Sequence, residues 1–163
     1  MLLLWPLIPK LFSRLNLWEE DRFISDSARW QAMYCLDWLV WGDTIVTPER
    51  LILNQLLCGV SLLTDASQVD ALAPLQQKDM DEWLIAIGQQ LAGWQKLSLT
   101  DIRQLFLQRR GEISTEGAFP QIKVRSEPYD YLLRDWPWPM TLAVLPWTQQ
   151  PLAIVWQLND SAA

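Results

Sequence analysis

The side chains that could do chemistry in this sequence are few. The 163 residues include no histidine, which removes the usual general base and the usual metal ligand. The two cysteines, Cys35 and Cys58, lie in apolar stretches, and two thiols without histidine do not make up a zinc site. We expect both to be buried as small hydrophobic side chains, and the sequence leaves open whether they are paired.

Carboxylates offer a second kind of chemistry. Asp79, Asp81 and Glu82 are close enough for a carboxylate dyad, but they stand at an apparent helix start, where acidic groups complement the helix dipole. We favour that structural role. The lysines lie in no recognisable motif, and the glycines are too dispersed for a phosphate-binding loop. The sequence therefore predicts no catalytic, cofactor-binding or metal site and no enzyme; an enzyme would need a deep polar cleft with converging acids or lysines.

Charge and hydropathy also restrict the partners. A net charge of -6 disfavours nucleic acid, because an acidic domain repels phosphates. The basic residues Arg103, Arg109 and Arg110 are interpreted as cations near the end of a helix, facing its dipole. The apolar start, residues 1–9, is too short to span a bilayer and lacks the pattern of a signal peptide. We expect a cytoplasmic protein with no membrane partner.

Tryptophan is the unusual residue of this chain, with 11 Trp against 3 Tyr and 4 Phe. Three of them lie in stiff proline-tryptophan segments, which lose little entropy on docking: Trp136, Trp138 and Trp147. We predict that these three form an exposed protein-binding set. The alternative is a loop whose indoles cap the sheet. If they are exposed, replacing all three by alanine weakens partner binding and leaves thermal unfolding nearly unchanged.

Local signals predict several helices. Ser25, Asp26 and Ser27 are all good N-cap types, and they precede an apolar stretch, residues 28–41, which Gly42 can end. Thr47 with Pro48 starts another helix that stops near Gly59. A stripe with four-three spacing runs from Met80 to Trp94, and a capping box at residues 98–101 starts a further helix that stops near Gly111. Before these, prolines should keep residues 1–9 extended or in turns, with a short helix at residues 11–18. Residues 60–77 resemble a loop with at most a short helix.

After Gly111 the pattern changes to strands. Phe119 to Val124 suggests short strands around a turn at Gly117, and residues 152–158 alternate as a strand that could pair with residues 141–145. The predicted fold class is α+β, in one domain over residues 1–163: a helical part of about four helices over residues 10–110, packed with a small C-terminal antiparallel β-sheet over residues 112–158. The core is assigned to a set of apolar side chains that includes Leu56, Leu57, Cys58, Leu105 and Phe106.

Five segments in order resemble the conserved C-terminal region of contractile injection system tape-measure proteins, the family found in phage-tail-like particles. They are Leu-Leu-Trp-Pro-Leu-Ile-Pro-Lys-Leu-Phe at residues 3–12, Pro-Glu at 48–49 with Leu-Asn-Gln-Leu-Leu-Cys-Gly at 53–59, Leu-Phe-Leu-Gln-Arg-Arg-Gly at 105–111, Asp-Tyr-Leu-Leu at 130–133, and Leu-Pro-Trp at 145–147 with Val-Trp at 155–156. The chain departs from the pattern at Asp135, where the family's first Leu-Pro-Trp element has leucine.

The resemblance implies a structural protein that lies in the tail tube and sets its length. A ruler must be as long as the tube, whereas 163 residues of unbroken helix would reach only about 245 Å. We therefore expect a terminal assembly module and not the ruler itself. Its expected partners are tail tube, spike or baseplate proteins, or another copy of the chain. The alternative is a chaperone-like adaptor that binds an apolar partner during assembly.

Overall fold

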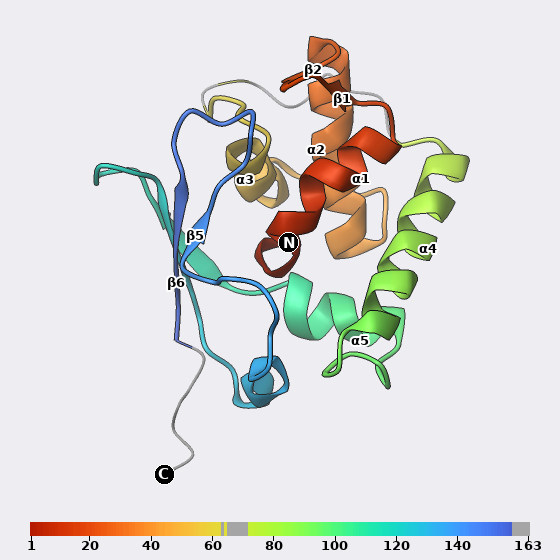
Figure 1. Cartoon of the computed structure of the whole chain (residues 1–163), viewed down its shortest axis with the longest axis vertical. Helices are drawn as coiled ribbons and strands as arrows, with labels where there is room; N and C mark the ends of the chain where they lie inside the picture. Colours follow the sequence, from red (N-terminus) through yellow and green to blue (C-terminus); the bar gives the residue numbers. More distant parts are fainter. Residues whose placement is uncertain (63, 65–71, 158–163) are drawn as a thin grey trace.

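The computed structural model describes residues 1–62, 64 and 72–157. Helices occupy one side of the molecule and a four-stranded sheet the other, so the α+β class is confirmed (Figure 1). The helical elements are η1 (Leu2–Leu7), α1 (Ile8–Arg14), α2 (Asp26–Trp41), α3 (Pro48–Leu57), α4 (Pro74–Gln90), α5 (Leu99–Ile102), η2 (Arg103–Leu107) and η3 (Pro128–Leu133). The strands are β1 (Trp18–Glu19), β2 (Arg22–Phe23), β3 (Gly111–Ser114), β4 (Gln121–Val124), β5 (Leu142–Ala143) and β6 (Leu152–Trp156).

The boundaries of α2 follow from its capping residues. The Ser25 hydroxyl oxygen accepts a hydrogen bond from the Ala28 N–H at 3.0 Å, which satisfies a free donor of the first turn. Gly42 ends the helix in the left-handed conformation, at φ 65°. Pro48 then opens α3 in the first turn, where a missing N–H costs nothing. These predicted helix ends are confirmed.

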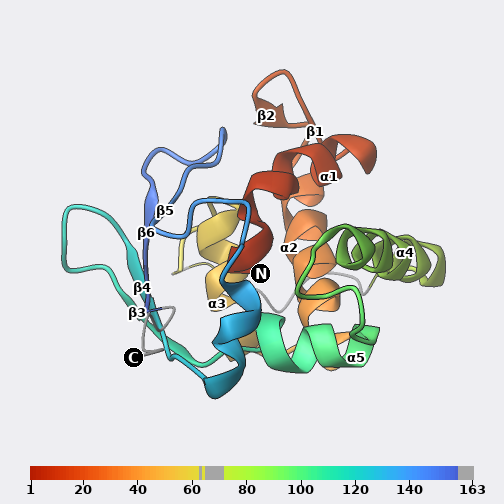
Figure 2. The same ribbon diagram turned by 60° about the horizontal axis from the view of Figure 1, so that its bottom comes forward.

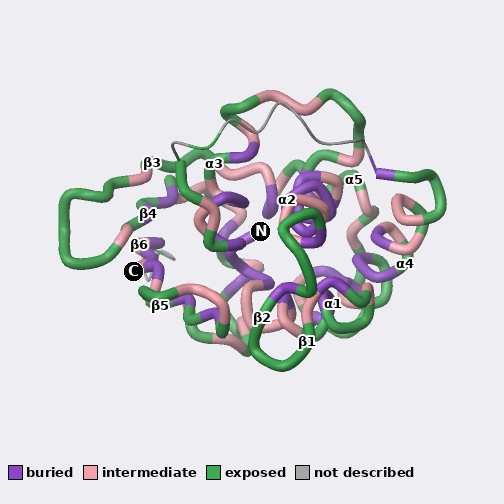
Figure 3. Tube along the Cα trace, turned by 90° about the horizontal axis from the view of Figure 1, so that it is seen from above, coloured by how far each residue is buried: buried purple, intermediate pink, exposed green. Residues whose placement is uncertain are grey.

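The first residues are helical, so the prediction that residues 1–9 are extended is wrong. Pro6 lies inside the 3₁₀ helix η1, and Pro9 lies in the first turn of α1, which spans Ile8–Arg14 and not residues 11–18. Pro9 is tolerated because a first turn leaves its N–H groups free anyway, whereas Pro6 lies inside η1 and supplies no main-chain donor there. Leu2, Leu3 and Leu4 are buried, and Figures 1 and 3 show this segment passing through the centre of the molecule.

Helix α4 begins earlier than predicted. It starts at Pro74, so the end of the expected loop at residues 60–77 is helical, and residues 63 and 65–71 of that loop lie outside the described residues. Asp79, Asp81 and Glu82 therefore sit one or more turns inside the helix, which overturns their assignment to its N-terminal dipole. Asp81 instead accepts hydrogen bonds from the Trp38 indole at 2.9 Å and from Arg103 at 2.7 Å.

The basic residues do not form a cationic last turn either. The helical run ends at Leu107, and Gly111 is the first residue of β3. Arg103 is at the start of η2, and its guanidinium donates to the main-chain oxygens of Leu39 and Trp38, at the end of α2. Its charge thus faces the negative end of a different helix from the one on which it lies.

The four-stranded sheet has the order β3-β4-β6-β5 and is mixed. The predicted antiparallel pairing is present between β3 and β4 and between β5 and β6, but β4 and β6 run parallel, with Ile122 beside Ile154. A parallel pair needs a long crossover, which η3 and β5 provide here. Figure 2 shows the β3–β4 hairpin projecting from the helical body.

The core lies between the sheet and the helices (Figure 3). Leu57, Cys58 and Phe106 are buried as predicted, whereas Leu56 and Leu105 are only half-buried at its border. Cys35 and Cys58 are both buried and unpaired, and burial raises the pKa of Cys35 to about 12. Every helix among the described residues is too short or too polar to span a bilayer.

Candidate protein-interaction surface

Trp136 and Trp138 pack on the N-terminal helix. The Trp136 indole N–H donates to the main-chain oxygen of Leu3 at 3.1 Å, and its ring lies 4.9 Å from that of the buried Trp94. Trp138 meets Trp136 edge to face at 5.5 Å. In return, the Trp5 indole donates to Pro139 O at 3.1 Å. Both Trp136 and Trp138 are half-buried, so each indole offers only part of its surface to a partner.

Trp147 belongs to another aromatic cluster. Its indole N–H donates to the Leu57 main-chain oxygen at 2.7 Å, which satisfies a carbonyl at the end of α3. Its ring centroid lies 5.4, 5.2 and 5.1 Å from those of Phe12, Trp18 and Phe23. Trp147 is also half-buried. Ring contacts therefore join Trp136 to Trp138 but place Trp147 among different neighbours.

These contacts correct one expectation. Two of the three indoles are anchored to main-chain oxygens of distant segments, and all three pack against the core. Removing them would leave buried carbonyl groups unsatisfied and open cavities. Replacement of all three by alanine should therefore lower the thermal stability, contrary to the expectation for a fully exposed set. The role of the remaining exposed surface in partner binding stays a prediction.

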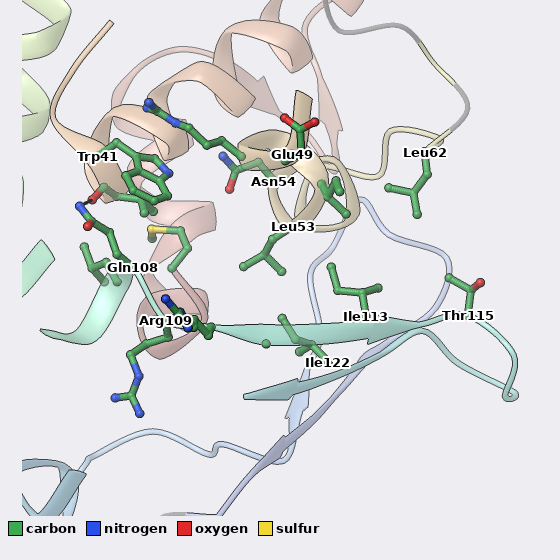
Figure 4. Close-up of a pocket in the computed structure, with 17 residues that line it drawn as sticks. Trp41, Glu49, Leu53, Asn54, Leu62, Gln108, Arg109, Ile113, Thr115 and Ile122 are labelled. Atoms are coloured by element: carbon green, nitrogen blue, oxygen red, sulfur yellow. Dashed lines mark hydrogen bonds between the residues drawn. The ribbon is translucent and has the colours of Figure 1, made fainter. Parts of the chain in front are cut away.

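A hollow of about 660 Å³ lies between the end of α2, α3 and the β3–β4 hairpin (Figure 4). Its walls carry apolar side chains, three of which are the large exposed residues Trp41, Ile52 and Leu62. Ile113 and Ile122 project into it from the two strands of the hairpin (Figure 4). Among the described residues, the charged side chains of the lining are one carboxylate, Glu49, and three arginines, Arg50, Arg109 and Arg110. Its chemistry suits an apolar side chain better than a polar substrate.

Two of the arginines beside the hollow are neutralised by carboxylates behind it. Arg50 donates to Asp37 and Asp43, each at 2.7 Å, and its guanidinium lies over the Trp41 ring at 4.7 Å. The pKa of Asp37 is raised, because its burial outweighs the charge of Arg50. The pKa of Asp43 is lowered, chiefly by the hydrogen bond from Arg50.

The second pair is Arg109 and Asp130, joined by two hydrogen bonds of 2.5 and 3.0 Å. Asp130 also accepts from the Trp156 indole at 3.2 Å and from the Glu127 N–H at 3.0 Å. Burial alone would raise the pKa of Asp130, but these hydrogen bonds and the Arg109 charge together lower it. Both side chains are buried, so this pair ties β3 and η3 into the core.

We find no cluster of three or more His, Cys, Asp or Glu side chains that could hold a metal ion in residues 1–62, 64 and 72–157. In the pair Arg109–Asp130, Asp130 also accepts from the Glu127 N–H and the Trp156 indole, and Arg109 also donates to the Arg125 main-chain oxygen, so both side chains are engaged by protein groups. The hollow and the outer faces of the half-buried indoles offer open apolar surface, whereas a second hollow, of about 500 Å³ at the β1–β2 turn, is lined by the carboxylates Glu19, Glu20 and Asp21.

A family model described as contractile injection system tape measure protein matches residues 1–156. The chain belongs to this family. No curated protein and no solved structure matches the chain at a significant level.

The matched region of this tape measure family member includes both aromatic clusters and the hollow. Sequence reasoning singled out the proline-tryptophan segments but missed the hollow. One signal was available in α3, where the apolar Ile52 stands beside the buried Leu51 and so points away from the core stripe. No local sequence pattern indicated that Trp41 and Leu62 line the hollow, because only the fold brings these two residues to it.

Proposed function

We propose that this chain is a docking module through which a tape measure protein attaches to another component of the injection particle. The support comes first from the shape of the chain. Its longest described helix, α4, spans Pro74–Gln90, which corresponds to about 26 Å. A segment that measures a tube must extend along it, whereas these elements fold back into one body around the N-terminal helix (Figure 1). A compact body of this kind is suited to attaching one end of a tape measure protein to a partner.

The exposed apolar groups support a protein partner. The exposed fractions of Trp41, Ile52 and Leu62 are 36%, 37% and 41%, and all three line the same hollow. Exposed apolar side chains that gather around a hollow are typical of protein contact sites. We propose that tube, spike or baseplate proteins insert an apolar side chain there. The outer faces of Trp136, Trp138 and Trp147 are the second proposed contact.

The experiment that tests this function is an affinity capture from cells that assemble the particle. Tagged wild-type chain should recover tube, spike or baseplate proteins, and Ile52→Asp should lose them, because the new charge would have to be desolvated in the hollow. Trp138→Ala probes the second surface with less damage to the fold, since its indole has no hydrogen bond to the main chain among the described residues.

The matched control is Leu75→Asp. Leu75 is 71% exposed on α4, which lies on the opposite side of the molecule from the sheet in Figure 1, and it does not line the hollow. This variant should capture partners as the wild type does, and thermal unfolding should confirm that all variants are folded. Recovery of no particle protein by the wild type would refute the docking function. A stable complex with a protein absent from finished particles would favour the chaperone-like adaptor instead.

A further inference from the structure

Strand β3 is an open edge of the sheet. In the order β3-β4-β6-β5 it is the end strand, and within the described residues its partner is β4 alone. Gly111, Glu112 and Ser114 are exposed, and the hairpin stands clear of the helices (Figure 2). An end strand presents unpaired N–H and C=O groups that can pair with another strand. The other end strand, β5, has two residues, so β3 is the longer template.

The pairing with β4 determines which groups of β3 point outward. The Arg125 N–H donates to the Arg110 main-chain oxygen at 2.9 Å, so Arg110 and Arg125 form a hydrogen-bonded pair. Pairs of this kind alternate with non-hydrogen-bonded pairs along an antiparallel ladder. Ile113, opposite Ile122, is therefore a non-hydrogen-bonded position. Its N–H and C=O point away from β4, toward the open edge.

The charges along this edge complement themselves under two-fold symmetry. If a second copy pairs antiparallel with β3 and the axis passes beside Ile113, each Ile113 exchanges its N–H and C=O with the other. Residues whose numbers sum to 226 then stand opposite each other. Arg110 directly precedes β3, and Glu116 lies two residues after its end, so each Arg110 comes close to Glu116 of the second copy where the chains leave the paired strands, and this happens twice. Glu112 faces Ser114, so no like charges meet across the edge.

Both charged residues are free to make this contact. Arg110 and Glu116 are exposed, and neither forms an ion pair within the described part of the chain. A two-fold interface requires a surface that complements itself, which is the property of this edge. We infer that two copies of this chain pair antiparallel through β3, centred on Ile113, and so join their sheets into one of eight strands.

The decisive experiment uses two charge-reversal variants, Arg110→Glu and Glu116→Arg, studied by sedimentation as purified proteins. Each variant alone places like charges opposite each other twice. Its self-association should therefore be weaker than that of the wild type by about tenfold or more. An equimolar mixture should regain association, because the unlike copies complement each other at both contacts. The double variant Arg110→Glu/Glu116→Arg should associate like the wild type.

A matched mixture separates local pairing from net charge. Lys96→Glu and Glu82→Arg change the charge by the same amounts at exposed positions outside the β3 edge. Each variant should associate like the wild type, and mixing the two should not strengthen the association. If this mixture behaved like the edge mixture, long-range charge would explain the result and the inferred interface would be wrong.

Ile113→Pro tests the main-chain contact. Its N–H makes no bond to β4, so proline is compatible with the folded edge strand but cannot donate to a second copy. Association should be lost while the unfolding temperature changes little. Hydrogen exchange gives a second readout, in which the Ile113 amide is protected only at high concentration. A wild type that stays monomeric up to about 1 mM, or an Ile113→Pro variant that is folded and still associates, would overturn the inference. Neither result depends on a particle component, so it is separate from the docking function.

Discussion

The guanidinium group of Arg103 occupies the space where a side chain on Gly42 would lie. A Cβ atom at residue 42 would come within 2.6 Å of Arg103 Nη1. Because Gly42 has no side chain, Arg103 can reach the end of α2 and donate to the main-chain oxygens of Leu39 and Trp38 at 3.0 and 3.2 Å. It also bonds Asp81 on α4, so one side chain connects three helical elements.

Gly42→Ala should destabilise the fold by about 1–2 kcal/mol or more. The left-handed backbone at φ 65° alone costs a residue with a Cβ about 1–2 kcal/mol, and the displacement of Arg103 adds to this. Chemical denaturation measures the difference. Gly117→Ala is the control, because a Cβ there meets only the Phe119 oxygen, at 3.7 Å. Equal effects of the two substitutions would show that the Gly42–Arg103 contact has no special weight.

Asp130→Asn should lower the free energy of unfolding by about 3–5 kcal/mol, which is the loss typical when one partner of a buried ion pair is removed. The side chains of Arg109 and Asp130 are 6% and 2% exposed, so the remaining arginine would keep a buried charge without its counterion. Asp135→Asn makes the same chemical change at an exposed position and should have almost no effect. Urea denaturation curves compare the two, and a small loss for Asp130→Asn would mean that the hollow side of Arg109 admits water.

The same carboxylate should make the fold sensitive to acid. The pKa of Asp130 is lowered in the folded state, so its stabilising contribution is fully present above the unfolded value of about 3.9 and is lost as the pH falls through the folded value. The contribution of Asp37 to stability depends on pH in the opposite direction, because its pKa is raised in the folded state and its protonation favours folding. The unfolding free energy of the wild type should therefore fall below pH about 4 more steeply than that of Asp130→Asn. Parallel curves for the two proteins would contradict the assignment.

Trp147→Phe should lower the unfolding free energy by about 1–3 kcal/mol. It keeps an aromatic ring among Phe12, Trp18 and Phe23 but leaves the Leu57 oxygen without its 2.7 Å bond. Trp138→Phe is the control, since the Trp138 indole makes no such bond among the described residues. Thermal and chemical unfolding measure both. If Trp138→Phe were the more damaging change, the aromatic contacts would matter more than the main-chain anchor.

Local signals predicted the parts of this fold that depend on neighbouring residues. The Ser25 cap and the Gly42 stop involve atoms within a few residues, so their types and spacing were sufficient. Pro9 misled the prediction because proline fits a first helical turn as well as an extended chain, and Pro6 lies inside a 3₁₀ helix, which its fixed φ also allows. The position of Asp81 was misread because the N-cap residue of α4 is Ala73, whose side chain cannot cap, although Gln76 accepts a hydrogen bond from the Ala73 N–H.

The rest depends on contacts between distant segments. The parallel pairing of β4 with β6 is set by the path of the chain through η3 and β5, which alternation of apolar residues does not encode. The half-burial of Trp136 and Trp147 follows from bonds to Leu3 and Leu57, 133 and 90 residues away in sequence. For the same reason the hollow, whose walls come from segments far apart in the sequence, left only the exposed Ile52 of α3 as a local sign.

The contact between Leu3 and Trp136 has a consequence for biosynthesis. While the ribosome is still making the middle of the chain, the leucines at residues 2–4 have no partner from the region of residues 136–139, to which Leu3 and Trp5 are bonded in the finished fold. The nascent chain must carry these leucines uncovered until that region emerges, and closing so long a loop is slow. We expect a growing chain of this protein to bind holding chaperones early and to release them only near the end of translation.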